Sequence, residues 1–173
     1  MKIVSVFLVA LLVSGALTAS CTVNRSSPLY KQCDSKWGSD GLGSSSTICK
    51  VGCLISAVSM ALAGAGKKIG GAVPTPKNLN SFLKANGGYS GNGFVWGSVE
   101  RFGVKYEGKV SDKNAVRTAI CGNKIVILNV NNGGHWVLAT GFNGDTFNVN
   151  DAGYSRTTYG VKDFGLVAIY RLA

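Results

Sequence analysis

The stretch Gly52–Ala63, GCLISAVSMALA, decides the fold of this chain. Its residues are apolar or small on every side, and a helix that is hydrophobic all round is a buried central helix. Gly64 and Gly66 follow as natural helix stops. The sequence therefore predicts a buried helix that begins at Cys53, where the unpaired N–H groups of a first turn favour a thiolate. The competing interpretation of Cys53 is a half-cystine or an inert buried thiol, which is the commoner fate of cysteines in secreted proteins.

Hairpin-linked strands are predicted downstream of this helix. Lys124–Val130 is a continuous apolar run typical of a buried strand, and Asn131–Gly134 is a strong turn signal. His135–Thr140, Thr146–Asn150 and Leu166–Tyr170 are the next predicted strands. Helices that come first and are followed by hairpin-linked strands indicate an α+β fold.

Further helices are predicted on either side of a strand at Val104–Val110. Thr75 is a typical N-cap, and Pro76 suits the first turn of a helix that ends before Gly87. A short helix is expected over Ser98–Phe102, and another from a Ser111 cap through Ile120. Residues 21–47 are predicted to be extended and rich in loops.

The N-terminus has the order of regions found in a secretory signal peptide. Lys2 precedes an apolar run over Ile3–Val13, which is too short for a comfortable membrane span. Small residues follow, so residues 1–20 are predicted to be a signal peptide cleaved between Thr18 and Ser20, and residues 21–173 the mature domain. A minor alternative is a lipoprotein anchored at Cys21. Either way the chain is expected to be exported, without a transmembrane segment.

Five cysteines lie beyond this leader: Cys21, Cys33, Cys49, Cys53 and Cys121. Disulfides persist outside the cytosol, and an odd number leaves one thiol unpaired. The simplest division is two disulfides and one working thiol. Four cysteines allow three pairings; we expect Cys33 with Cys49, which leaves Cys21 and Cys121. A disulfide between Cys49 and Cys53 would instead mask the candidate nucleophile.

The composition and net charge of the chain limit the classes of partner that it is expected to bind. The chain has 173 residues, of which 46% are apolar and 15% charged, so it is not a disordered tail. A net charge of +10 suits an anionic surface or cell-wall polymer. The basic residues are scattered, with Lys67-Lys68 as the one adjacent pair, so nucleic-acid binding is not expected. No cofactor is expected, and Cys49, Cys53 and His135 make a poor metal-ligand set.

His135 is the single histidine of the chain and opens a predicted strand. Asp151 and Asn150 follow across one hairpin, where either side chain could accept a hydrogen bond from the imidazole and fix its tautomer. The plainer interpretations are a structural histidine and a turn aspartate, since Asp-Ala-Gly is good turn chemistry. Gln32 has no local role in the pattern and alone would be an ordinary exposed glutamine.

The combination resembles the papain-like cysteine enzymes, and in detail the C39-like peptidases. The resemblance rests on the segments Tyr30–Trp37 (YKQCDSKW), Thr47–Cys53 (TICKVGC), Gly133–Gly141 (GGHWVLATG) and Asn150–Gly153 (NDAG). It implies a papain-like fold, with a buried nucleophile helix packed on a C-terminal antiparallel sheet.

The resemblance also implies a role for each matching residue. Cys53 becomes the nucleophile, His135 the general base and acid, Asp151 the residue that orients it, and Gln32 the oxyanion-hole side chain. Leu54-Ile55-Ser56 stands where the family often has Pro-Thr-Ser, and Ala replaces Pro in the NDAG segment. Transporter-linked members cut leader peptides after Gly-Gly; no transporter segment is expected with this chain, so that substrate is not assigned to it.

Three functions follow as hypotheses. The first is a secreted cysteine peptidase that cleaves peptide or amide bonds through a thioester, with a peptide or a protein as its substrate. The second is a cell-wall amidase or endopeptidase that uses the same residues. The third is a non-catalytic, basic, secreted binding protein on the same fold. A free Cys53 favours the first two, and a bridged Cys53 favours the third. A monomer is expected in each case.

Overall fold

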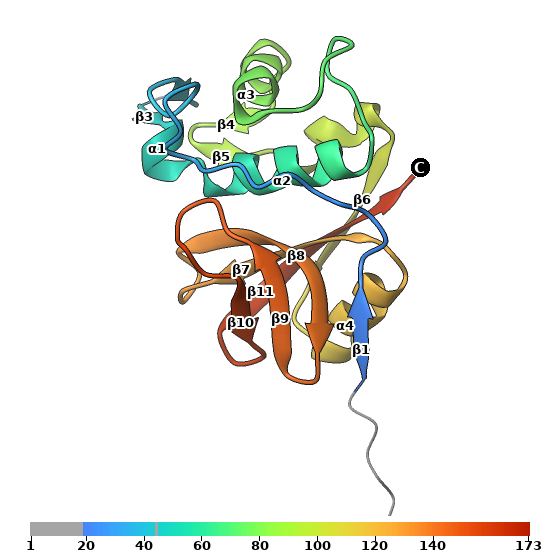
Figure 1. Ribbon diagram of the computed structural model, residues 1–173. Helices are drawn as coiled ribbons and strands as arrows, with labels where there is room; N and C mark the ends of the chain where they lie inside the picture. The colour runs from blue at the N-terminus through green and yellow to red at the C-terminus, as the bar shows by residue number, and fades with distance from the viewer. Residues whose placement is uncertain (1–18, 44) are drawn as a thin grey trace, which may run out of the picture.

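The computed structural model describes residues 19–43 and 45–173, and it places a layer of helices against a curved antiparallel sheet (Figure 1). In Figure 1 helix α2 runs along the boundary between the two layers, with α3 on its far side from the sheet. The predicted signal peptide, residues 1–20, lies outside the described residues except for its last two positions.

The main sheet has seven strands, all paired in antiparallel fashion, in the order β10-β9-β8-β7-β11-β6 with β1 added beside β8. Its strands are β1 (Ser20–Thr22), β6 (Val104–Val110), β7 (Ile125–Val130), β8 (His135–Asn143), β9 (Thr146–Asn150), β10 (Thr158–Gly160) and β11 (Phe164–Leu172). Two short hairpins stand apart from it: β2 (Gly41–Leu42) with β3 (Ser46–Thr47), and β4 (Tyr89–Ser90) with β5 (Gly93–Phe94).

Both faces of the sheet are covered, which is why strand β7 is buried along its whole length. Ile125 and Ile127 pack in the core shared with α2 and α3, whereas Val126 and Leu128 pack in a second core with α4. Alternate residues of a strand point to opposite faces, so a continuous apolar run marks a strand with helices on both sides.

The helices are α1 (Ile48–Val51), α2 (Cys53–Gly64), α3 (Pro76–Ala85) and α4 (Lys113–Cys121), with the 3₁₀ helix η1 (Trp96–Phe102). The predicted all-round burial of α2 is confirmed, since every residue from Ile55 to Leu62 is buried. The predicted cap of α3 is also confirmed: Thr75 and Asn78 form a reciprocal capping box.

Two sequence predictions about helices need refinement. The short helix expected at Ser98–Phe102 is present as a 3₁₀ helix that begins two residues earlier and is closed by Gly103 with φ 74°. The N-cap of α4 is Asp112 rather than Ser111, because the Asp112 carboxylate accepts from the backbone N–H groups of Asn114 and Ala115. The loop-rich segment 21–47 also contains the short strands β1, β2 and β3.

The two expected disulfides, Cys33–Cys49 and Cys21–Cys121, are both present. Cys21–Cys121 ties β1 to the end of α4, and it contradicts the lipoprotein alternative because a sulfur in a disulfide cannot carry a lipid thioether. Within residues 19–43 and 45–173 we find no helix that combines the length and the apolar character needed to span a bilayer.

Candidate active site

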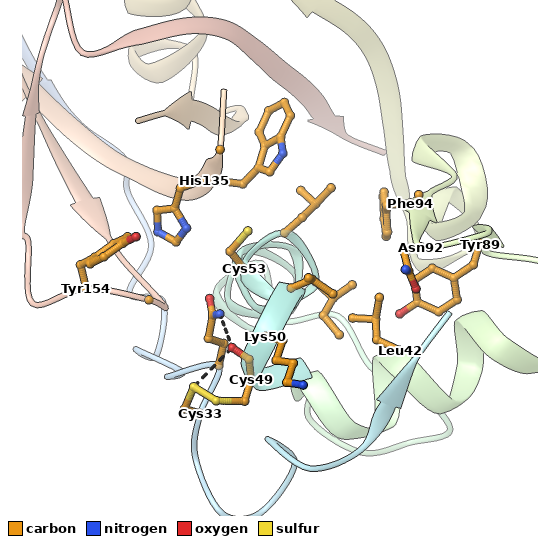
Figure 2. A pocket seen from close by; sticks show the side chains of 18 of the residues that line it. Cys33, Leu42, Cys49, Lys50, Cys53, Tyr89, Asn92, Phe94, His135 and Tyr154 are labelled. Atoms are coloured by element: carbon orange, nitrogen blue, oxygen red, sulfur yellow. Dashed lines mark hydrogen bonds between the residues drawn. A yellow bond between two sulfur atoms is a disulfide. The ribbon is translucent and has the colours of Figure 1, made fainter. Parts of the chain in front are cut away.

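An open cleft of about 680 Å³ lies where the start of α2 faces the start of β8 (Figure 2). Cys53, His135 and Gln32 line it together with Gly153 and Tyr154 of the segment after β9. The cleft therefore collects three of the four side chains singled out from the sequence. The fourth, Asp151, lies directly behind His135.

Cys53 is the first residue of α2, is half-buried, and is the one free cysteine among the described residues. Gly52 sets this position because it forms the junction between α1 and α2. A Cβ on Gly52 would lie 2.4 Å from the carbonyl oxygen of Ile48, so no other residue fits this turn without a shift. The backbone N–H of Cys53 belongs to a first helical turn, whose amides have no acceptors inside the helix.

His135 is the first residue of β8 and is only 5% exposed. Its Nε2 lies 2.7 Å from Oδ1 of Asp151, and the Cys53 side chain faces the ring from the start of α2 (Figure 2). Burial disfavours the imidazolium, but the hydrogen bonds and charges of Asp151 and Cys53 outweigh it and raise the pKa of His135 to about 9. The imidazole is thus placed between a thiol and a carboxylate.

Asp151 is 1% exposed and accepts hydrogen bonds at both oxygens. Oδ1 accepts from His135 and from the backbone N–H groups of Gly153 (2.8 Å) and Tyr154 (2.9 Å), and Oδ2 accepts from the Tyr159 hydroxyl (2.8 Å). Burial opposes the charge, yet these donors together lower the pKa of the carboxyl group. Asn150, the alternative partner, donates its amide instead to the carbonyl oxygens of Ser27 and Pro28.

Three residues of this site were not identified from the sequence. Tyr159, in β10, holds Asp151 as described, and its own pKa is raised to about 12, first by burial and then by the Asp151 carboxylate. Lys31 donates from Nζ to the carbonyl oxygens of Asp151 (2.8 Å) and Tyr154 (2.6 Å). The Tyr154 ring stands edge-on to the imidazole at 5.0 Å. The one sequence signal for Lys31 was its place beside Gln32.

Gln32 is fixed at both its backbone and its side chain. Its backbone N–H donates to the Ala152 carbonyl at 3.0 Å, and its Nε2 donates to the Cys49 carbonyl at 2.7 Å. An amide nitrogen carries two protons, so one N–H remains beyond the bond to Cys49. The side-chain oxygen lies against Gly153, whose added Cβ would be 3.3 Å from it.

The rest of the cleft is apolar and cationic. Its apolar lining comes from Leu42, Leu54, Tyr89, Phe94, Trp96 and Trp136. Nζ of Lys109 lies 4.9 Å from the ring centre of Trp96 and 5.9 Å from that of Trp136. Lys50 also lines the cleft, and the described lining contains no acidic residue. A neutral or acidic chain would suit this surface better than a basic one.

The arrangement has the parts needed for addition of a thiol to a carbonyl group. A nucleophile, a base within hydrogen-bond reach and a third group that orients the base form the recurring pattern of covalent acyl transfer. Over the described residues, no three His, Cys, Asp or Glu side chains are grouped so that they could hold a metal ion.

Among known proteins, a solved structure resembles this chain in its fold. No protein-family model matches the sequence, and no curated protein matches it. A solved structure does match: the crystal structure of a double glycine motif protease from an AMS/PCAT transporter in complex with the leader peptide. The TM-score is 0.56 at 15% sequence identity, over 90% of this chain and 99% of that chain.

This chain therefore shares its mixed helix and antiparallel-sheet fold with a double glycine motif protease. That likeness supports, at the level of the fold, the resemblance to C39-like peptidases expected from the sequence motifs.

Proposed function

We propose that the chain is an exported cysteine peptidase that hydrolyses peptide bonds through a thioester on Cys53. The observation that carries the proposal is that the free Cys53 and His135 face each other in one cleft, with the buried Asp151 bonded to the far side of the imidazole. The structural relative was solved with a leader peptide, which supports a peptide as the substrate. The two disulfides support an oxidising compartment outside the cytosol.

In the proposed reaction the Cys53 proton passes to His135 and the sulfur attacks the carbonyl carbon of the scissile bond. The oxyanion that forms would receive the backbone N–H of Cys53 and the second side-chain N–H of Gln32. The imidazolium then protonates the leaving amine, and a thioester remains. Water attacks the thioester with His135 as base, which releases the acid and regenerates the thiol.

Asp151 has an orienting role in this scheme. Because Nε2 of His135 faces Asp151, Nδ1 is the nitrogen left for Cys53. Tyr159 and two backbone amides hold the carboxylate from other sides, so it cannot turn away from the imidazole without losing them.

A cell-wall amidase or endopeptidase is the second candidate. Its support is the excess of positive charge, +10 for the chain, together with Lys50 and Lys109 in a cleft without acidic lining. The same four residues would carry it out. The third possibility is a non-catalytic binder, which a bridged Cys53 would have favoured. Neither disulfide includes Cys53, so this support is missing.

The test is a two-part assay of the exported protein. Iodoacetamide labelling with peptide mapping measures the reactivity of Cys53, and hydrolysis is measured on a mixed peptide library and on peptidoglycan fragments. We expect Cys53→Ala to abolish hydrolysis, and Gln32→Ala to lower kcat by about 10²- to 10³-fold, as for the loss of an oxyanion donor. Lys68→Gln, outside the cleft, is the control.

The outcomes separate the candidates. Cleavage within unbranched peptides supports the peptidase, and release of amino groups from peptidoglycan alone supports the cell-wall enzyme. If Cys53 reacts with iodoacetamide but the protein hydrolyses neither substrate, the proposal is wrong and a binding role takes its place.

A further inference from the structure

We infer that the Cys33–Cys49 disulfide positions the oxyanion hole, so that acyl transfer by Cys53 requires this cysteine pair to be oxidised. The inference rests on the proposed function. It assigns a role in the reaction to a disulfide whose two cysteines line the cleft.

The first step of the argument is the way in which the Gln32 side chain is held. Its one hydrogen bond within the described residues runs from Nε2 to the Cys49 carbonyl, at 2.7 Å. Its Oε1 is buried without a hydrogen-bond partner in the same part of the chain. The position of Cys49 therefore determines where the free N–H of Gln32 points.

The second step is that the disulfide joins these two partners directly. Cys33 is the neighbour of Gln32 in sequence, and Cys49 supplies the oxygen that Gln32 binds. Sγ of Cys33 lies 3.4 Å from that oxygen, although a disulfide sulfur has no proton to donate to it. Figure 2 shows the pair at the edge of the cleft, below Cys53.

The third step is that little else ties the two segments together at this point. The remaining backbone link from Cys49 runs from its N–H to the Gly38 carbonyl, five residues beyond Cys33. Without the disulfide, Gln32 and Cys49 are joined by a single, part-buried side-chain hydrogen bond. Such a bond contributes little against the conformational freedom of a long side chain.

The chemistry of the switch is an ordinary thiol–disulfide exchange. A dithiol reductant transfers two electrons and two protons to the Cys33–Cys49 bond and is itself oxidised to a disulfide. Cys33 is exposed, so a reductant can reach the bond. The reduced chain keeps Cys53 as a thiol but holds the Gln32 side chain less firmly against Cys49, and the proposed enzyme is acylated slowly until the pair is oxidised after export.

The experiment compares two reactions of the same sulfur. With p-nitrophenyl acetate, Cys53 forms a bond to the acetyl carbon, p-nitrophenolate leaves, and the tetrahedral intermediate carries an oxyanion. With iodoacetamide, the sulfur displaces iodide from a saturated carbon and no oxyanion forms. We expect Cys33→Ser/Cys49→Ser to slow acylation at least about 10-fold and to change alkylation less than about 2-fold.

Two further variants distinguish positioning from general damage. Cys21→Ser/Cys121→Ser removes the other disulfide, which closes a longer loop and lies outside the cleft, so acylation should be unchanged. Gln32→Ala combined with Cys33→Ser/Cys49→Ser should be no slower than Gln32→Ala alone, because both changes act through one amide. The inference would be overturned if Gln32→Ala and Cys33→Ser/Cys49→Ser together slowed acylation by the product of their separate effects. It would also be overturned if removal of either disulfide slowed acylation equally.

A titration of the wild-type protein serves if a variant does not fold. The protein is equilibrated in dithiol buffers of increasing reducing strength, and mass spectrometry measures the fraction of each disulfide that remains. Acylation should follow the Cys33–Cys49 fraction and not the Cys21–Cys121 fraction; the reverse result would refute the inference. If oxidised wild-type protein is alkylated at Cys53 but never acylated, the proposed function itself has failed.

Discussion

His135 provides an unusual experimental opportunity because it is the only histidine of the chain. The proton NMR signals of its imidazole ring can therefore be assigned without comparison with other histidines. The ring is buried, bonded to a carboxylate and close to a thiol, so its protonation measures how strongly those neighbours act on it.

We predict that the imidazole titrates with a pKa of about 9, well above the ordinary value, because Asp151 and Cys53 outweigh the effect of burial. Asp151→Asn should move the midpoint down by at least about one unit, since it removes the negative partner. The measurement is the pH dependence of the imidazole carbon-bound proton signals. A midpoint near that of a free histidine in the wild-type chain would contradict the geometry of the site.

The same pKa shift has a consequence for stability, and its sign follows from linkage. The pKa is raised in the folded state, so the stabilisation is fully present below the unfolded value near 6.5 and is lost as the pH rises through about 9. Asp151 behaves in the opposite way: its pKa is lowered, so its contribution is present above the unfolded value and is lost as acid protonates the folded state.

Gly153 should tolerate no side chain. A Cβ there would lie 2.8 Å from Cε1 of His135 and 3.3 Å from Oε1 of Gln32, so Gly153→Ala must displace one of them. We expect kcat/KM to fall by about 10- to 100-fold, since small misplacements of a catalytic group have effects of that size. Gly165→Ala is the matched control because open space surrounds its Cβ. Equal activity in both variants would show that the imidazole is not packed as described.

At the scale of elements, local signals in the sequence were sufficient where the structure is local. The buried helix α2, the capping box of α3 and the run of β7 each depend on a few neighbouring residues, and each was predictable. The strand β10 and the helix α1 were missed, because three or four residues of ordinary composition become regular only through their neighbours in space.

The candidate site also combines features that neighbouring residues in the sequence predict with features that depend on contacts between distant residues. The order of Cys53, His135 and Asp151 along the chain was visible in the sequence motifs, as was the position of Gln32. The contact of Lys31 with the carbonyl of Asp151 joins residues 120 positions apart, so no local pattern could reveal it. The choice between Asp151 and Asn150 required the direction in which each side chain leaves the end of β9.

The two disulfides should differ in their effect on stability. The loop closed by Cys21–Cys121 spans 100 residues and that of Cys33–Cys49 spans 16. From chain entropy, their removal should lower the free energy of unfolding by about 5 and about 3 kcal/mol respectively. Urea unfolding of the two double-serine variants measures the difference. A larger loss from the shorter loop would mean that native contacts, and not loop length, dominate.

At the scale of the whole molecule, a net charge of +10 gives the protein a positive electrostatic field. Lys50 and Lys109 add two positive charges within the lining of the cleft itself. Neither lysine has a carboxylate partner within the described residues. Their charges are therefore available to a bound chain.

We predict that an acidic peptide is a better substrate than its neutral amide counterpart, and that added salt removes the advantage. Lys50→Gln/Lys109→Gln should reduce kcat/KM for the acidic peptide by about 3- to 10-fold and leave the neutral peptide nearly unchanged. Lys68→Gln/Lys162→Gln makes the same change of net charge outside the cleft and should have a much smaller effect. An equal loss in both variants would show that the field of the molecule, and not the cleft, selects the substrate.

The aromatic wall of the cleft also makes the protein its own optical probe. Trp96 and Trp136 face each other edge-on at 5.2 Å, both line the cleft, and the Lys109 ammonium lies over both rings. The third tryptophan, Trp37, is buried outside that lining. A molecule entering the cleft would displace water from the first two indoles and leave the third unchanged. The ultraviolet emission of the unlabelled protein should therefore report when its cleft is filled, before any bond is broken.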